Sequence, residues 1–250
     1  MKIGIIGTGA IGEVIIRNLR TADYEVKMAN ANGPESLKEL ALEVGATAVT
    51  VENAVQDVDI AILALPTKAI PELPKDLFAK VKPGTIVIDT SNYYPSFRDG
   101  KIDELEKGMP ESEWVSWQIR YPVIKAFNAM IAHSLTYKGR PSGSTDRLAL
   151  PVSGDDSQAK NAVAKIIDSI GFDAVDIGSI SESWKQQPGS SIYCADLTKE
   201  EILHWYPKTQ KALLPERREQ ISQVYLNLPE GATIKDQLKA LRDILQNNLA

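Results

Sequence analysis

Three glycines near the start of the chain have the spacing of a loop that approaches a dinucleotide closely. Gly7, Gly9 and Gly12 follow a short apolar run, residues 2–6, and precede a stretch with the periodicity of an amphipathic helix. At such a turn the first glycine permits a tight bend, the second lets a pyrophosphate reach the backbone, and the third allows the helix to pack closely on the strand. We therefore predict that a dinucleotide binds at residues Gly7, Thr8, Gly9, Ala10, Ile11 and Gly12, against the alternative of a purely structural strand–helix turn.

The second predicted strand ends in a polar turn that bears on the choice between NAD and NADP. NAD-binding proteins commonly place a carboxylate there for the ribose 2′-hydroxyl. This chain has Ala29-Asn30-Ala31-Asn32-Gly33-Pro34, and the lack of an acid removes repulsion against a 2′-phosphate. Asn30 and Asn32 could donate hydrogen bonds to that phosphate, although Asn32 could instead cap the helix that Pro34 begins. The turn favours NADP, with NAD as the alternative.

The ends of the later strands carry small polar groups rather than a set of acid and base catalysts. Ligands bind at such ends in an open α/β sheet, which here are residues 65–67, 89–92 and 127–128. Lys125 and Asn128 resemble the Lys-x-x-Asn pair of hydroxyacid dehydrogenases, but at a strand end their side chains are expected on opposite faces. We interpret Lys125 as structural and His133 as packed on the next helix. Both stay weak candidates for acid–base catalysis.

These residues need a framework of alternating strands and helices. Strands are predicted over 2–6, 25–28, 46–51, 58–65, 85–88, 123–127, 148–152 and 174–177, and helices over 13–19, 35–43, 77–81, 103–107 and 157–170. The almost wholly apolar run 58–65 is typical of a strand that is covered on both faces. The alternation predicts an α/β fold, a Rossmann-type doubly wound and mainly parallel sheet.

The chain changes character after Leu197, where it becomes helical, rich in charge and interrupted by prolines. We therefore predict an NAD(P)-binding domain over residues 1–197 and a helical extension over 198–250. The last helix, predicted over 233–248, has Ile234, Leu238, Leu241 and Leu245 on one face. This face is expected to dock on the chain's own core, with a dimer contact as the alternative.

Composition excludes several classes of protein. The 250 residues include 28 basic and 33 acidic side chains, a net charge of −5, without a basic cluster of the kind that binds nucleic acid. A single cysteine, Cys194, and two histidines exclude an intrachain disulfide and a thiolate-rich or histidine-rich metal site. No apolar run is long enough to span a membrane, and no signal peptide fits before the first strand. We expect a cytoplasmic protein without a metal.

Longer stretches of the chain resemble the bacterial and archaeal NADPH:deazaflavin oxidoreductases, which use the coenzyme called F-420. The matching stretches are residues 7–12, 30–37, 89–100, 125–128, 149–156 and 187–196, all within residues 1–197. The Asn-Tyr-Tyr-Pro and Gln-Pro-Gly sequences among them are far more specific than the glycine motif. The same fold resembles the cytosolic domain of membrane ferric reductases, which moves hydride from NADPH to a flavin.

The resemblance implies direct hydride transfer between NADP(H) and a deazaflavin or flavin ring, in which the cofactors carry the chemistry and the protein aligns them. The residues that it implies around the nicotinamide are Leu65, Pro66, Ala126 and Asn128, and those that help close the acceptor pocket are Gly189, Ser190 and Ser191. Family members are commonly dimeric, so a homodimer is expected. They commonly have Ser-Arg where this chain has Ala31 and Asn32.

Two other functions are compatible with a dinucleotide site. A dehydrogenase of a small hydroxy acid or imine would use Lys125, Asn128 or His133. A non-enzymatic NAD(P) sensor would need the dinucleotide site but no second pocket, and the segment 187–193 therefore favours an enzyme.

Overall fold

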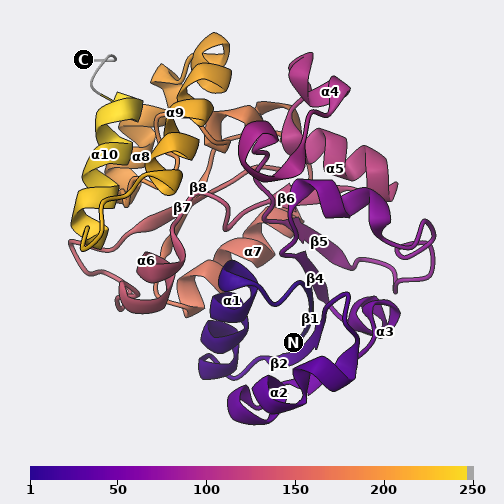
Figure 1. Ribbon diagram of the computed structural model, residues 1–250. Coiled ribbons are helices and arrows are strands. Elements are labelled where there is room, and N and C mark those ends of the chain that lie inside the picture. Colours follow the sequence, from indigo (N-terminus) through magenta and orange to yellow (C-terminus); the bar gives the residue numbers. More distant parts are fainter. Residues whose placement is uncertain (247–250) are drawn as a thin grey trace.

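A computed structural model describes residues 1–246 and arranges them as alternating strands and helices that end in a helical tail (Figure 1). The strands are β1 (Lys2–Ile6), β2 (Glu25–Ala29), β3 (Thr47–Ala48), β4 (Ile60–Leu63), β5 (Ile86–Asp89), β6 (Val123–Lys125), β7 (Ala149–Val152) and β8 (Asp173–Asp176). The α-helices are α1 (Ala10–Thr21), α2 (Lys38–Val44), α3 (Val51–Val55), α4 (Asp103–Glu106), α5 (Glu111–Ile119), α6 (Ala132–Tyr137), α7 (Ser157–Ser169), α8 (Lys199–Trp205), α9 (Leu214–Leu226) and α10 (Ile234–Gln246). Short helical turns of other types cover Pro34–Leu37, Thr67–Glu72, Pro95–Asp99, Ile180–Gln186, Tyr206–Lys208 and Lys211–Leu213.

Strands β1 to β6 form one parallel sheet in the order β3-β2-β1-β4-β5-β6. Ile5 of β1 lies opposite Met28 of β2 on one side and Ile62 of β4 on the other. This order confirms the predicted Rossmann-type doubly wound sheet. The winding reverses between β1 and β4, and such sheets bind ligands in the crevice outside the carboxyl ends of these strands.

Helices cover both faces of the sheet (Figure 1). On one face α1 and α7 contribute to a buried cluster that contains Ile15, Ile62 and Ile166, and on the other α3 and α5 contribute to one that contains Val55 and Trp114. The predicted strands β7 and β8 form a separate parallel pair, which an antiparallel bridge between Lys125 and Ser153 joins to β6.

Two local predictions are wrong. The strand predicted over 46–51 is limited to Thr47–Ala48, because the Thr50 side chain accepts a hydrogen bond from the Asn53 amide at 3.3 Å and so caps α3. The helix predicted over 77–81 is absent, and residues 75–80 form turns instead. This segment lies between Pro74 and Pro83, and its amides bond as in single turns, Leu77 to the Pro74 carbonyl oxygen at 2.9 Å and Ala79 to that of Asp76 at 3.1 Å.

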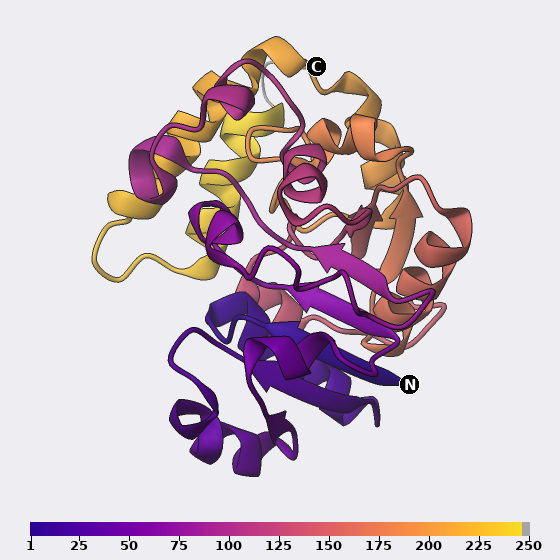
Figure 2. The ribbon, with the colours of Figure 1, turned by 90° about the vertical axis from the view of Figure 1, so that its right-hand side faces the viewer.

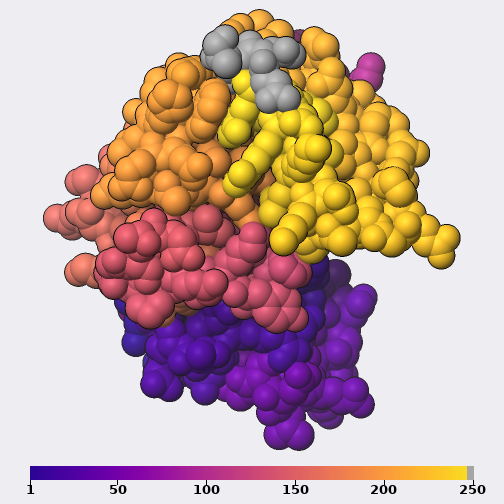
Figure 3. Space-filling model, turned by 90° about the vertical axis from the view of Figure 1, so that its left-hand side faces the viewer, coloured from indigo at the N-terminus to yellow at the C-terminus, as the bar shows by residue number. Residues whose placement is uncertain are grey.

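The tail folds back onto the body of the chain. Leu238, Leu241 and Leu245 of α10 are buried in a cluster with Tyr94 and Tyr193, which confirms that the predicted apolar face docks on the chain's own core. Positions 247 and 248 of the predicted helix lie outside the described residues. The tail, orange to yellow, lies at the end of the molecule opposite the indigo strands β1 and β2 (Figures 1 and 2). The yellow part of the tail, which contains α10, lies at the surface of the molecule (Figure 3).

The helices of this fold are short. Among the described residues, the longest helices are α7, α9 and α10, with 13 residues each. Within residues 1–246 no helix has both the length and the apolar character of a membrane span.

Candidate functional site

The three glycines of the β1–α1 turn differ in what surrounds them. Gly7 has a φ of +107°, and a Cβ atom there would lie 2.1 Å from the carbonyl oxygen of Ala64 after β4. A Cβ on Gly12 would lie 2.0 Å from the carbonyl oxygen of Gly7. A Cβ on Gly9 would meet no heavy atom within 4 Å. Gly7 and Gly12 therefore allow close packing, whereas the space at Gly9 is open to a ligand.

The start of α1 provides hydrogen-bond donors at this open space. The Glu13 amide donates to the Gly9 carbonyl oxygen at 2.9 Å, so the amides of Ala10, Ile11 and Gly12 precede the first intrahelical bond. Free amides and the partial positive charge at a helix N-terminus suit a phosphate. Thr8, half-buried, lies within 3.5 Å of Asn30 at the end of β2.

The turn after β2 has an ordered asparagine and an exposed one. The Asn30 side-chain oxygen accepts hydrogen bonds from the Asn32 amide at 2.9 Å and from the Ser36 hydroxyl at 3.2 Å, which shapes the turn. Asn32 itself is exposed. The following helical turn begins after Gly33, without a side-chain cap, so the alternative role of Asn32 as a helix cap is wrong. Its amide side chain stays available to a ligand.

An interlocked amide pair joins the ends of β5 and β6. The Asn128 side-chain nitrogen donates to the Asn92 side-chain oxygen at 3.1 Å and to the Gln186 carbonyl oxygen at 2.7 Å. The Asn92 side chain donates back to the Asn128 carbonyl oxygen at 3.0 Å. Gln186 donates to the Asn128 side-chain oxygen at 2.8 Å. This network ties the ends of β5 and β6 to each other and to Gln186.

A cavity of about 250 Å³ lies between the glycine turn, these strand ends and the tail. Its lining consists of Ile11, Thr90, Asn92, Phe127, Asn128, Met130, Ile131, Ala132, Tyr193, Cys194, Tyr225 and Gln237. We call it the strand-end cavity. Ile11 comes from the glycine motif, whereas Tyr225 and Gln237 come from α9 and α10. Apolar and aromatic side chains dominate the lining, and none of its side chains is an Asp, Glu, Lys, Arg or His.

Sequence reasoning missed Tyr193, Cys194, Tyr225 and Gln237 as lining residues. Tyr193 and Cys194 lie within the segment 187–196, so the resemblance marks the segment but not these side chains. Residues of α9 and α10 carry no motif, and only the folding back of the tail brings them to the cavity.

Two tyrosines of the cavity wall, Tyr193 and Tyr225, cluster with a third, Tyr94. The Tyr94 hydroxyl donates to the Tyr193 hydroxyl at 2.8 Å, and the Tyr94 and Tyr225 rings lie 6.3 Å apart. Burial raises the pKa of all three tyrosines above the ordinary value, because an anionic phenolate would lose its hydration. These phenols therefore stay protonated and act as hydrogen-bond donors rather than as bases.

Of the residues predicted around the nicotinamide and the acceptor, only Asn128 lines the strand-end cavity. Leu65 and Pro66 are half-buried after β4, and Ala126 is buried after β6. The predicted acceptor residues are buried behind the cavity wall. A Cβ on Gly189 would lie 2.5 Å from the Leu214 carbonyl oxygen, and the Ser191 hydroxyl donates to the Trp205 carbonyl oxygen at 2.7 Å. Ser190 is also buried.

Lys125 lies in a buried charge cluster and not in the strand-end cavity. Its ammonium group donates to the Ser91 carbonyl oxygen and lies 3.2 Å from an Asp89 carboxylate oxygen and 3.7 Å from Glu111. All three charged side chains are at most 1% exposed. The structural interpretation of Lys125 agrees with this placement.

The prediction that His133 packs inside is wrong. The α6 residues that face the core are Ser134 and Leu135, so His133 projects outward, where its ring lies 5.0 Å from that of Tyr137. Neither Lys125 nor His133 lines the strand-end cavity.

Glu111 is the unusual member of the charge cluster, because neither carboxylate oxygen has a hydrogen-bond partner among the described residues. Burial raises its pKa from 4.5 to about 7, although the nearby Lys125 ammonium opposes this shift. The folded protein therefore binds a proton between these pH values that the unfolded chain does not. Stability is expected to fall as pH rises through this interval.

Replacing Glu111 by glutamine is expected to flatten the dependence of stability on pH. The variant should unfold like the wild type at pH 5 and be more stable at pH 8 by on the order of 2–3 kcal/mol, because it holds no carboxylate to ionise in the interior. Urea unfolding between these pH values measures the effect. Glu113→Gln on the same helix is the control and should follow the wild type. If the stability of Glu111→Gln depends on pH as that of the wild type does, the pKa of Glu111 is not raised in the folded protein.

The chain is similar to a described family and to two curated bacterial proteins. Residues 2–93 match a family model described as "NADP oxidoreductase coenzyme F420-dependent". The protein YjhV of Escherichia coli K12 is 35% identical over 109 residues, which are 43% of this chain and 74% of that protein. D-apionate oxidoisomerase of Cupriavidus necator is 32% identical over 90 residues, which are 35% of this chain and only 32% of that enzyme.

Two solved structures extend the similarity over most of the chain. Protein SMa0349 of Sinorhizobium meliloti superposes with a TM-score of 0.66 and 32% identity, covering 80% of this chain and 96% of the other. An F420-dependent NADP reductase of Arthrobacter sp. FB24 superposes with a TM-score of 0.61 and 21% identity, covering 73% and 87%. The latter identity is low, so that likeness shows a shared fold.

Proposed function

Because this chain belongs to the family of coenzyme F420-dependent NADP oxidoreductases and is an NAD(P)-dependent oxidoreductase, we propose that it transfers a hydride between NADP(H) and a deazaflavin or flavin. In this proposal the dinucleotide pyrophosphate lies on the open backbone at Gly9, against the start of α1. The nicotinamide then extends toward Leu65, Pro66, Ala126 and Asn128 at the ends of β4 and β6.

The observation that carries the proposal is the uncharged lining of the strand-end cavity. Hydride transfer between two ring systems requires their reacting carbons at about 3–3.5 Å, in a site that excludes water. It requires no protein nucleophile, since the rings supply the chemistry. Apolar side chains such as Ile11 and Ile131 can contact flat heteroaromatic rings, and the phenols of Tyr193 and Tyr225 can donate to heteroatoms of the acceptor.

The predicted acceptor residues have an indirect role in this proposal. Gly189 and Ser191 hold the segment that leads to Tyr193 and Cys194 against the tail, through the close contact with Leu214 and the hydrogen bond to Trp205. The acceptor would thus contact the residues that follow the segment 189–191 more than the segment itself.

A dehydrogenase of a small hydroxy acid or imine is the second candidate. Its support is the similarity to D-apionate oxidoisomerase, whose name indicates a polyhydroxy acid substrate. A hydroxy acid needs a base for its hydroxyl and a cation for its carboxylate. Lys125 is held by Asp89, and His133 lies outside the cavity. The geometry therefore favours the ring acceptor.

Anaerobic mixing of the protein with NADPH and one acceptor at a time tests the proposal. The acceptors are a deazaflavin, FMN, FAD and riboflavin, and a parallel series supplies NADP⁺ with D-apionate. Oxidation of NADPH by a deazaflavin or flavin is the expected result. Reduction of NADP⁺ by D-apionate, together with no reaction in the first series, would replace the proposal with the second candidate.

The cofactor preference is expected to respond to Asn32. An arginine at this exposed position brings a charge and a fork that matches a phosphate, so Asn32→Arg should tighten NADPH by about one to two decades with little change for NADH. Asn32→Asp should do the reverse, since a carboxylate repels the 2′-phosphate and accepts from the 2′-hydroxyl.

Dissociation constants of both cofactors, measured by calorimetry for wild type and variants, give the result. Asn161→Arg at an exposed position of α7 controls for the added charge. If the ratio of the two constants moves in neither Asn32 variant, the adenosine ribose does not reach this turn.

We propose that the enzyme acts on a small-molecule redox acceptor and forms a homodimer, as the family resemblance implies. Sedimentation of the purified chain over a range of concentrations tests the dimer.

A further inference from the structure

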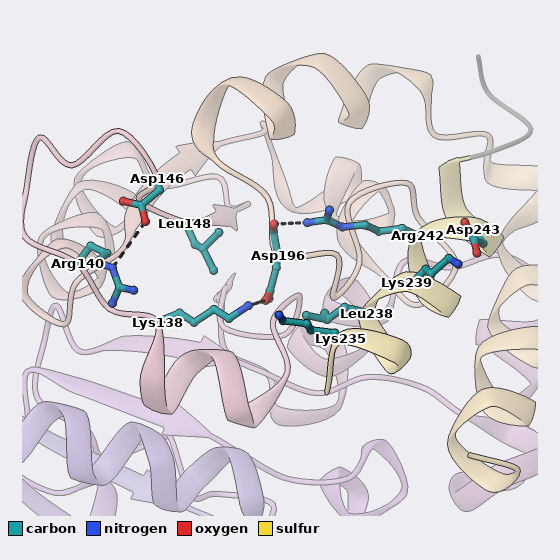
Figure 4. Close-up of a pocket in the computed structure, with 10 residues that line it drawn as sticks. All are labelled: Lys138, Arg140, Asp146, Leu148, Asp196, Lys235, Leu238, Lys239, Arg242 and Asp243. Atoms are coloured by element: carbon teal, nitrogen blue, oxygen red, sulfur yellow. Dashed lines mark hydrogen bonds and ion pairs between the residues drawn. The ribbon is translucent and has the colours of Figure 1, made fainter. Parts of the chain in front are cut away.

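A second, open cavity of about 590 Å³ lies beside α10 (Figure 4). It is lined by Lys138, Arg140, Asp146, Leu148, Asp196, Lys235, Leu238, Lys239, Arg242 and Asp243. Three regions far apart in the sequence supply its charges: the loop between α6 and β7, the segment before α8, which contributes Asp196, and the tail helix α10. We call it the basic cavity, because cations outnumber carboxylates in its lining.

The excess of positive charge is local. The lining holds five cations and three carboxylates, whereas the whole chain has a net charge of −5. Lys138 is neutralised by Asp196 at 2.8 Å, and Arg140 lies 3.8 Å from Asp146. The remaining lining charges all lie on α10, which contributes three cations and one carboxylate, Asp243.

The cations of α10 are not matched by carboxylates in the same way. Within residues 1–246, Lys235 and Lys239 form no ion pair closer than 4.0 Å, and both are exposed. Arg242 donates from Nε to the Ala195 carbonyl oxygen at 2.7 Å and from one terminal nitrogen to that of Asp196 at 2.8 Å. These carbonyl groups fix the guanidinium at the cavity wall without cancelling its charge.

Asp196 organises the basic cavity. Its side chain accepts from Lys138 and from the buried Ser134 hydroxyl, at 2.8 and 2.6 Å, while its main-chain oxygen accepts from Arg242. Its backbone has a φ of +50°, a conformation that is uncommon for a residue other than glycine. One residue thus brings a cation of the α6–β7 loop and a cation of α10 to the same wall, as Figure 4 shows.

We propose that the basic cavity binds a small phosphate-bearing anion. A planar carboxylate is recognised best along the side-on edge of an arginine, and on Arg242 that edge is already occupied by two carbonyl groups. Lysine ammonium groups are point charges with three donors each. The exposed ammonium groups of Lys235 and Lys239 therefore suit a tetrahedral group with several acceptor oxygens.

The position of α10 couples this site to the strand-end cavity. Gln237 lines the strand-end cavity, whereas its neighbour Leu238 lines the basic cavity and packs in the cluster that contains Tyr193 and Cys194. A bound anion would join the cations of α10 to Lys138 and Arg140, and would therefore stabilise the tail where it forms the wall of the strand-end cavity. Anion binding in the basic cavity is independent of whether a deazaflavin or a flavin accepts the hydride.

Calorimetric titration with pyrophosphate tests the site. Because the glycine turn is also proposed to bind phosphates, each titration is carried out with and without saturating NADP⁺. The test variant is Lys235→Gln/Lys239→Gln, since both side chains are exposed and their loss should not disturb folding. The control is Lys101→Gln/Lys107→Gln, which removes the same charge at exposed positions elsewhere.

Pyrophosphate is expected to bind in the presence of NADP⁺, to raise the melting temperature, and to bind at least about tenfold more weakly to the test variant than to the control. Three results would each overturn the proposal: no heat of binding to the wild type with NADP⁺ present, complete displacement by NADP⁺, or equal affinity in the two double variants. Citrate is the comparison ligand, and binding as tight as that of pyrophosphate would overturn the choice of phosphate.

Discussion

Gly9→Val is expected to abolish NADPH binding while the protein stays folded. Gly9 has φ −74° and ψ −173°, an extended conformation that valine adopts readily, and its Cβ position is empty to 4 Å. The added methyl groups would occupy the space in which the pyrophosphate meets the α1 amides. Loss of two hydrogen bonds to a charged group, each worth about 1.5–3 kcal/mol, weakens binding by at least about a hundredfold.

Alanine substitutions at Gly12 and at Gly9 itself are the comparison variants. Gly12→Ala places a Cβ 2.0 Å from the Gly7 carbonyl oxygen, so this smaller substitution should lower the melting temperature as well as binding. Gly9→Ala should fold normally and bind with intermediate affinity. Fluorescence titration with NADPH and thermal unfolding separate the two effects. A folded Gly9→Val protein with the wild-type affinity would remove the dinucleotide from this turn.

The N-terminal half of the fold could be predicted from the sequence because its signals are local. These signals are a glycine turn directly after an apolar strand, a proline at the start of a helical turn, and apolar runs such as 58–65. Local signals fail where neighbouring residues decide. Thr50 caps a helix and so ends β3. The segment between Pro74 and Pro83 forms single turns in place of the helix expected over 77–81.

The candidate site could be predicted only in its dinucleotide half. Gly9, Asn32 and Asn128 stand at strand ends, which periodicity locates along the chain. Tyr225 and Gln237 reach the strand-end cavity because α9 and α10 fold back against Tyr94 and Tyr193. Such long-range packing leaves no pattern at the positions themselves. For the same reason His133, among apolar neighbours in sequence, could not be assigned to the outer side of α6.

Lys125→Met is expected to lower the free energy of unfolding by about 3–5 kcal/mol, the usual cost of removing one partner from a buried ion pair. The lysine is fully buried, and its removal would leave Asp89 and Glu111 in the interior without a counter-charge. It would also remove the donor to the Ser91 carbonyl oxygen, next to Asn92 of the strand-end cavity. Urea unfolding measures the loss, with Lys101→Met at an exposed position as the control.

The pH dependence of this loss distinguishes charge from packing. A carboxyl group whose pKa is raised in the folded state destabilises it above the unfolded pKa, so the deficit of Lys125→Met should be larger at pH 8 than at pH 5. A deficit caused by packing alone would not change with pH. The triple variant Asp89→Asn, Glu111→Gln, Lys125→Met holds no buried charge at these positions and should recover part of the stability. If Lys125→Met is as stable as the control at both pH values, the cluster is not a structural ion pair, and Lys125 again becomes a candidate for catalysis.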